Sequence, residues 1–115
     1  MAKTRIAILY DFDKTLCTTD MQEYDFIKNL GLTPDEFWGS TGDITEKHGM
    51  DKILAYMYMM LKACKDRNIP LTKEYLNKCG ENVILYRGVT SWFDRIAEAA
   101  NQIGDVTVEH YIVSS

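Results

Sequence analysis

The chain has 115 residues, of which 46% are hydrophobic and 26% charged, and its formal net charge is −4. These values are typical of a soluble protein with one modest core, and the scattered thirteen Lys and Arg argue against a nucleic-acid partner, which needs clustered positive charge. No run of about 18 apolar residues indicates a membrane span, and the basic start lacks a signal-peptide core, so we expect no membrane partner and a cytoplasmic location.

An apolar run from Ile6 to Tyr10 ends at two carboxylates, Asp11 and Asp13. Its β-forming residues predict a parallel strand buried on both faces. Ligands in open α/β sheets bind beyond the carboxyl ends of the strands, and the two acids are two residues apart, so we expect both to face one small site. Such acids can share a hard cation, of which Mg²⁺ is the obvious candidate, and divide the roles of nucleophile and proton donor.

The two acids allow two other interpretations, an EF-hand loop and a helix cap. In an EF-hand loop counted from Asp11, Leu16 would replace the glycine at position 6 and Gln22 would replace the glutamate at position 12, which excludes that loop. The remaining alternative is that Asp11 is the cap of a helix that follows the strand.

Three cysteines are widely spaced and form no CxxC pair, so neither a disulfide framework nor a zinc site is indicated. We expect reduced thiols. Cys64 lies in an apolar helical pattern and is expected in the core, whereas Cys17 lies close to the two acids and is expected to be chemically accessible.

Helix signals follow the first strand. A helix is predicted over residues 21–30. Residues 33–36 form a helix start, with Thr33 as cap, proline at the first position and a capping-box glutamate, and they predict a short helix through Trp38. The loop composition of residues 39–43 predicts a mobile loop whose small residues could lie over a substrate.

The longest predicted helix covers residues 51–65, where apolar residues recur at three- and four-residue steps: Ile53, Leu54, Met57, Tyr58 and Leu61. A methionine stripe of this kind can line an adaptable binding surface but is more often packing. His48 is interpreted as a polar loop residue. Another helix is predicted over residues 72–80, so that residues 17–86 form an all-helical insertion that cannot belong to a sheet.

The chain then returns through a helix over residues 92–102, with Phe93, Ile96, Ala97 and Ala100 facing inward, and a strand over residues 106–113. Strand, helical crossover and strand form a parallel α/β unit. Ser114 and Ser115 follow the second strand.

The sequence Asp11-Phe12-Asp13-Lys14-Thr15-Leu16 resembles the DxDxT motif of the haloacid dehalogenase-like phosphohydrolases. The related ion-pump ATPases carry DKTGT, which would make Asp13 the nucleophile, but Leu16 and Cys17 occupy the last two positions and favour a hydrolase. The resemblance implies a Rossmann-like core of parallel strands, here partial and formed by residues 1–16 and 87–115, with an inserted helical cap at 17–86 that closes over the acids.

The family's roles carry over by position. The resemblance implies that Asp11 attacks phosphorus to give an aspartyl-phosphate, and that Asp13 protonates the leaving group and then deprotonates water. Mg²⁺ would bind the Asp11 carboxylate and the Asp13 main-chain carbonyl. Thr15 would hold the turn at the phosphate site, and Ser114, with Ser115 beside it, resembles the second motif, whose hydroxyl binds a phosphate oxygen.

The family pattern continues with a lysine and an acidic pair that complete the site. We therefore expect this chain to be the N-terminal part of a longer protein, to need the remaining C-terminal part of the core as a partner, and to be a poor catalyst alone. The expected function is Mg²⁺-dependent hydrolysis of a small phosphorylated metabolite. A phosphotransferase or mutase, and a non-catalytic remnant that binds a phosphorylated ligand or a partner, remain alternatives, and the sequence leaves the oligomeric state open.

Overall fold

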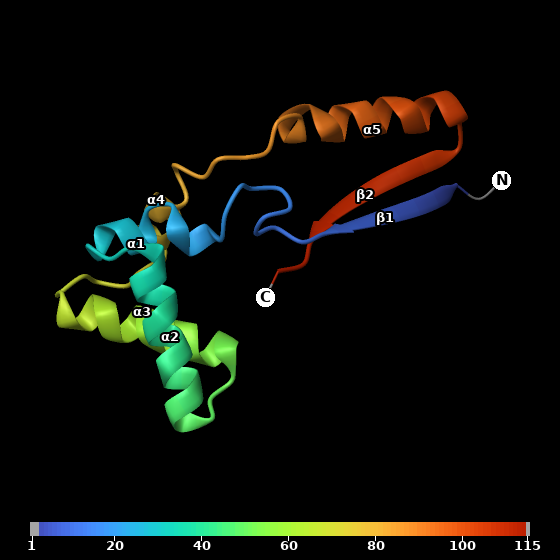
Figure 1. Ribbon diagram of the computed structural model, residues 1–115. Coiled ribbons are helices and arrows are strands. Elements are labelled where there is room, and N and C mark those ends of the chain that lie inside the picture. Colours follow the sequence, from blue (N-terminus) through green and yellow to red (C-terminus); the bar gives the residue numbers. More distant parts are fainter. Residues whose placement is uncertain (1–2, 115) are drawn as a thin grey trace. The chain divides into compact units, whose positions relative to one another are not determined.

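The computed structural model describes residues 3–114, and its sheet pairs two strands from opposite ends of the chain. β1 (Thr4–Tyr10) and β2 (Val106–Ile112) run in parallel, with Tyr10 opposite Ile112 (Figure 1). The crossover helix α5 (Val89–Ile103) packs against β2. This confirms the predicted parallel unit: within residues 3–114 the chain is α/β, with five α-helices and a two-stranded parallel sheet.

The two faces of this sheet differ. One face carries Tyr10 and His110, whose rings contact Phe93 of α5. On the opposite face Arg5 lies 2.7 Å from Glu109, and Leu9 is 64% exposed. The prediction that the first strand is buried on both faces is therefore wrong for the described residues, because α5 covers only one of them.

The helix α5 begins earlier than predicted. Its N-cap is Gly88, whose φ of +91° favours glycine, and no side chain caps it. Of the residues predicted to face inward, Ala100 is buried, whereas Phe93 is 36% exposed. Gly104 ends the helix, as expected from its position after the apolar pattern.

Residues 21–30 form two short pieces where one helix was predicted. A 3₁₀ turn, η1 (Met21–Glu23), precedes α1 (Phe26–Asn29). The Asp25 carboxylate accepts a hydrogen bond from Asn82 Nδ2 at 2.8 Å and caps nothing, so a distant contact replaces the local helix start. Four residues of this segment are nevertheless buried, namely Tyr24, Phe26, Ile27 and Leu30.

The helix α2 (Pro34–His48) is continuous, so the loop predicted over residues 39–43 is wrong. The predicted capping box between Thr33 and Glu36 is present. Thr41, in the middle of the supposed loop, is buried, and its hydroxyl donates to the Phe37 carbonyl at 3.0 Å. Burial against the neighbouring helices thus outweighs the weak helix propensity of the glycines and threonines here. His48 is consequently the last residue of α2, not a loop residue.

Two further helices follow the predicted signals. In α3 (Lys52–Asp66) the cap is Asp51, and in α4 (Lys73–Cys79) the cap is Thr72. The apolar stripe of α3, however, is exposed, with relative exposures between 40% and 59% for Ile53, Leu54, Met57, Tyr58 and Leu61. The buried face of α3 consists of small residues that let the helix approach its neighbours closely, namely Ala55, Ala63 and Cys64.

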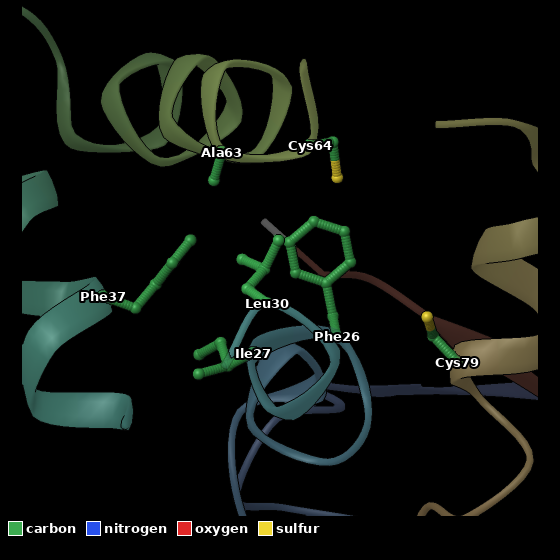
Figure 2. Packing of buried hydrophobic residues seen from close by; sticks show 7 residues of the cluster. All are labelled: Phe26, Ile27, Leu30, Phe37, Ala63, Cys64 and Cys79. Carbon is green, nitrogen blue, oxygen red and sulfur yellow. The ribbon is translucent and has the colours of Figure 1, made fainter. Parts of the chain in front are cut away.

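The core of the helical part draws its side chains from four helices (Figure 2). It contains Phe26, Ile27, Leu30, Phe37, Ala63, Cys64 and Cys79. The rings of Phe26 and Phe37 meet edge to face at 6.5 Å between centroids. Burial raises the pKa of the Cys64 and Cys79 thiols, so both stay protonated near neutral pH and act as small apolar groups. This agrees with the core position predicted for Cys64.

The chain divides into two compact units. Met21–Val83 is the helical unit, and the described residues on either side of it, 3–20 and 84–114, form the sheet unit. The assignment of residues 17–86 to a cap stays a prediction, because compactness does not say what a unit covers. Within residues 3–114 no helix has the length and apolarity that a membrane crossing requires.

The continuity of α2 can be tested at Gly42. A Cβ at this helical position would meet no atom within 4 Å, so Gly42→Ala should raise the free energy of unfolding by about 1 kcal/mol in urea titrations. The matched control is Gly49→Ala, where φ is +59°, and there we expect a loss of about 1 kcal/mol. A destabilising Gly42→Ala would indicate that residues 39–43 are a loop after all.

Candidate functional site

The two motif acids lie in the turn that leaves β1. Asp11 is exposed and follows the last residue of the strand, while Asp13 is half-buried. The Asp11 carboxylate accepts a hydrogen bond from the Phe12 amide at 3.0 Å. Among the described residues the first helical turn after β1 begins only at Met21, so the alternative that Asp11 caps a following helix is wrong.

The turn is built around the main-chain carbonyl of Phe12. This oxygen accepts the amides of Thr15 at 3.1 Å, Leu16 at 3.0 Å and Cys17 at 3.3 Å. Lys14 adopts the left-handed conformation, with φ of +60°, which lets the chain reverse within so few residues. The exposed Thr15 and the two acids are therefore held on one short, internally hydrogen-bonded turn.

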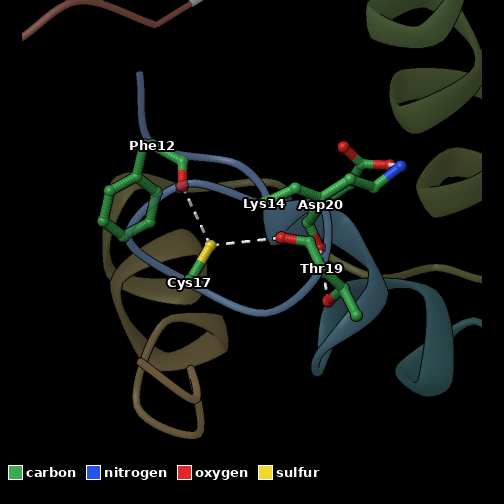
Figure 3. A network of polar contacts seen from close by, with 5 residues as sticks. All are labelled: Phe12, Lys14, Cys17, Thr19 and Asp20. Carbon is green, nitrogen blue, oxygen red and sulfur yellow. Dashed lines mark hydrogen bonds and ion pairs between the residues drawn. The ribbon is translucent and has the colours of Figure 1, made fainter. Parts of the chain in front are cut away.

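Cys17 supports this turn from within. Its side chain is fully buried, and its thiol donates to the carbonyls of Phe12 at 3.5 Å and Thr19 at 3.1 Å (Figure 3). The expectation that Cys17 is chemically accessible is thus wrong, because the turn folds around the thiol. Beside it, the Lys14 ammonium lies 3.5 Å from the Asp20 carboxylate.

The serine of the second motif follows the neighbouring strand. The Val113 amide donates to the Tyr10 carbonyl at 2.8 Å, so the two strands stay paired up to the residues that precede Ser114 and Asp11. Both side chains thereby follow the carboxyl ends of adjacent parallel strands, where α/β sheets bind ligands. Ser114 is exposed, and Ser115 lies outside the described residues.

The two segments that connect the sheet unit to residues 21–83 are paired with each other. Cys17 and Leu85 form an antiparallel bridge. The Thr18 amide donates to the Ile84 carbonyl at 3.0 Å, and the Tyr86 amide donates to the Leu16 carbonyl at 2.9 Å. The end of the motif turn is thus tied to the segment that returns to α5.

A polar network that the sequence did not predict connects the two strands to α5. The Trp92 indole donates to the Tyr10 hydroxyl at 2.7 Å, and this hydroxyl lies 2.8 Å from His110 Nδ1. The three side chains belong to α5, β1 and β2, and Tyr10 directly precedes Asp11. No local sequence signal indicates this network, because its three side chains come from separate elements.

The opposite face of the sheet carries a second polar group. The Glu109 carboxylate accepts hydrogen bonds from Arg5 at 2.7 Å and from the Tyr111 hydroxyl at 3.0 Å. The Arg5 guanidinium, followed by this hydroxyl, holds the pKa of Glu109 below its usual range. This group is exposed to solvent and contains none of Asp11, Asp13, Thr15 and Ser114.

A groove of about 550 Å³ lies between α2 and α3. Four acidic side chains line it, Asp35, Glu36, Asp43 and Asp66, with two cationic ones. Lys62 lies 2.8 Å from Asp66, which raises the lysine pKa, and Arg67 donates to the carbonyls of Leu30 and Ala63. Because the cations are occupied and acids dominate, this groove does not suit a phosphate.

The carboxylates of the turn are of the type that binds Mg²⁺. No set of three or more acidic, histidine or cysteine side chains suitable for a metal occurs within residues 3–114. Mg²⁺ is commonly bound by only one or two carboxylates together with substrate phosphate and water, so Asp11 and Asp13 supply a suitable oxygen donor set.

Comparisons with protein-family models, with curated proteins and with solved structures found no match to this chain.

The burial of Cys17 predicts slow alkylation. In the folded protein Cys17 should react with iodoacetamide about 100-fold more slowly than in urea, because the turn must open before the thiol is exposed. Mass spectrometry of the tryptic peptides measures each thiol separately, with the equally buried Cys64 as an internal reference. Equal rates for Cys17 in the folded and unfolded protein would contradict the hydrogen-bonded turn.

Proposed function

We propose that this chain carries the first half of a haloacid dehalogenase-like phosphohydrolase site, and that the intact protein hydrolyses a small phosphorylated metabolite with Mg²⁺. The observation that carries the proposal is the Asp11-Phe12-Asp13-Lys14-Thr15 turn at the carboxyl end of β1, with Ser114 after the end of the adjacent parallel strand. In this reading residues 17–86 are the cap, and the sheet unit is part of a Rossmann-like core.

Two carboxylates divide the chemistry. An Asp11 oxygen forms a bond to phosphorus while the bond from phosphorus to the leaving oxygen breaks, and Asp13 gives its proton to that oxygen. Water then attacks the aspartyl-phosphate, Asp13 takes the proton from water, and inorganic phosphate leaves as Asp11 is regenerated. The exposed Asp11 is accessible to a substrate, as a nucleophile must be.

The groups around the acids have supporting roles. The Ser114 hydroxyl, and Ser115 beside it, would donate hydrogen bonds to phosphate oxygens, while Thr15 would hold the turn at the phosphate. The Asp11 carboxylate and the Asp13 main-chain carbonyl would hold Mg²⁺, which offsets the negative charge of nucleophile and phosphate when bound. The resemblance also implies a lysine and an acidic pair from the remaining part of the core, so the intact protein is the proper sample for assays.

The inserted helical unit supports the choice of a small substrate. A unit inserted directly after the catalytic turn is suited to act as a cap that excludes water and selects the ligand. The paired linkers at Cys17 and Leu85 connect such a cap to the turn through main-chain hydrogen bonds.

Two other functions are alternatives to hydrolysis. A phosphotransferase or mutase would share the first half-reaction and differ only in the acceptor, for which Asp13 serves equally well. A non-catalytic binding protein is favoured by one observation, the exposed apolar stripe of α3 with Leu54, Met57 and Leu61 at its centre. Of these three functions, only the binding protein is expected to work without Asp11.

The nucleophile is tested by Asp11→Asn in the intact protein. We expect turnover of an aryl phosphate with Mg²⁺ to fall by about 10⁴-fold or more, because an amide cannot form the aspartyl-phosphate. Asp94→Asn, an exposed aspartate on α5, is the matched control and should keep wild-type activity. Turnover that survives Asp11→Asn would overturn the nucleophile, and a wild-type protein without turnover, with or without Mg²⁺, would favour the binding function.

The proton donor is tested by Asp13→Asn. Turnover should fall by about 10²- to 10⁴-fold, and the loss should shrink for substrates whose leaving group is a weak base and needs no proton. A series of aryl phosphates with increasingly acidic phenols measures this dependence. A loss of the same size across the series would show that Asp13 does not protonate the leaving group.

A further inference from the structure

The hydroxyl of Tyr10, the residue that precedes the proposed nucleophile, links three secondary-structure elements. An indole nitrogen can only donate, so the Trp92 bond of 2.7 Å uses one lone pair of the Tyr10 oxygen. The same hydroxyl also bonds His110 Nδ1, 2.8 Å away. The two bonds connect α5, β1 and β2.

The direction of the bond between Tyr10 and His110 depends on the tautomer of the imidazole. With the ring proton on Nε2, the Tyr10 hydroxyl accepts from Trp92 and donates to Nδ1. With the ring proton on Nδ1, both Trp92 and His110 donate to the Tyr10 oxygen. In either tautomer the hydroxyl is bonded to both side chains.

Ring packing fixes the same three elements. The Tyr10 and His110 rings lie nearly parallel, with an interplanar angle of 19° and centroids 5.7 Å apart. The edge of Phe93 meets the His110 ring at 4.9 Å. All these side chains are only partly buried, so the hydrogen bonds, more than tight packing, must set the position of the Tyr10 ring.

The main chain of Tyr10 also connects the two strands. Its carbonyl accepts the Val113 amide at 2.8 Å, a bond between the two chain segments directly before Asp11 and Ser114. A rotation of Tyr10 would therefore move the start of the motif turn and weaken the bond that holds the second strand end beside it.

We propose that Tyr10 is a positioning residue, which Trp92 and His110 hold so that Asp11 and Ser114 stay in register for one phosphate. The role of the register in catalysis depends on the function proposed above, whereas the mechanical role of the network does not. Misplacement of a nucleophile by a fraction of an ångström lowers turnover without preventing substrate binding.

The test begins with Tyr10→Phe, which removes only the hydroxyl. We expect kcat to fall about tenfold with little change in KM, and exchange of the Val113 amide with deuterium to become about tenfold faster. The control is Tyr111→Phe, which removes a bonded hydroxyl from the opposite face of the same sheet and should change neither quantity. Because exchange requires no turnover, an inactive wild-type protein would defeat the proposed function but would leave the positioning role open to the same measurement.

Two histidine variants separate positioning from general stability. His110→Asn keeps an acceptor near the position of Nδ1 and should retain most of the activity and the slow exchange of Val113. His110→Leu should reproduce the losses of Tyr10→Phe, and the double variant Tyr10→Phe/His110→Leu should be no worse than either single variant. Equal losses in the Asn and Leu variants, or additive losses in the double variant, would overturn the proposal.

Discussion

The parallel pairing of β1 with β2 is the contact on which the other features of the sheet unit depend. It joins residues about a hundred positions apart, from Thr4 opposite Val106 to Tyr10 opposite Ile112, and closing so long a loop is entropically unfavourable. The helix α5 offsets part of that loss by covering one face of the pair. Once the register is set, the ends of both strands, and hence Asp11 and Ser114, fall at one edge without any further contact between the two residues.

Local signals were sufficient for much of the fold. The strands, the crossover helix, the capping box at Thr33 and the cap at Thr72 could all be identified from a few neighbouring residues. Features that depend on distant contacts could not. Asp25 bonds to Asn82 and interrupts a helix that its neighbours favour, and the burial of Thr41 keeps α2 helical through two glycines. The exposed stripe of α3 shows the same limit, because periodicity reveals an apolar face but not what the face contacts.

The candidate site shows the same division. Asp11, Asp13 and Thr15 were predicted because type and spacing alone define their motif, and Ser114 because it follows a strand. The structure adds what holds the first three on one turn, which is the convergence of three amides and a thiol on the Phe12 carbonyl. The buried position of Cys17 and the tyrosine hydroxyl between Trp92 and His110 had no local signal, since each depends on partners from other elements.

The paired linkers at Cys17 and Leu85 place the beginning and the end of the intervening segment side by side. For the sheet, the 63 residues from Met21 to Val83 are therefore equivalent to a loop that leaves and returns at a single point, whatever its length. Insertions, deletions or a complete exchange of that segment would change neither the strand register nor the motif turn. The bonds that hold the strand register and the Phe12 turn come from residues outside Met21–Val83. Under the proposed function, the reaction and the choice of ligand would therefore depend on segments that can change separately in evolution.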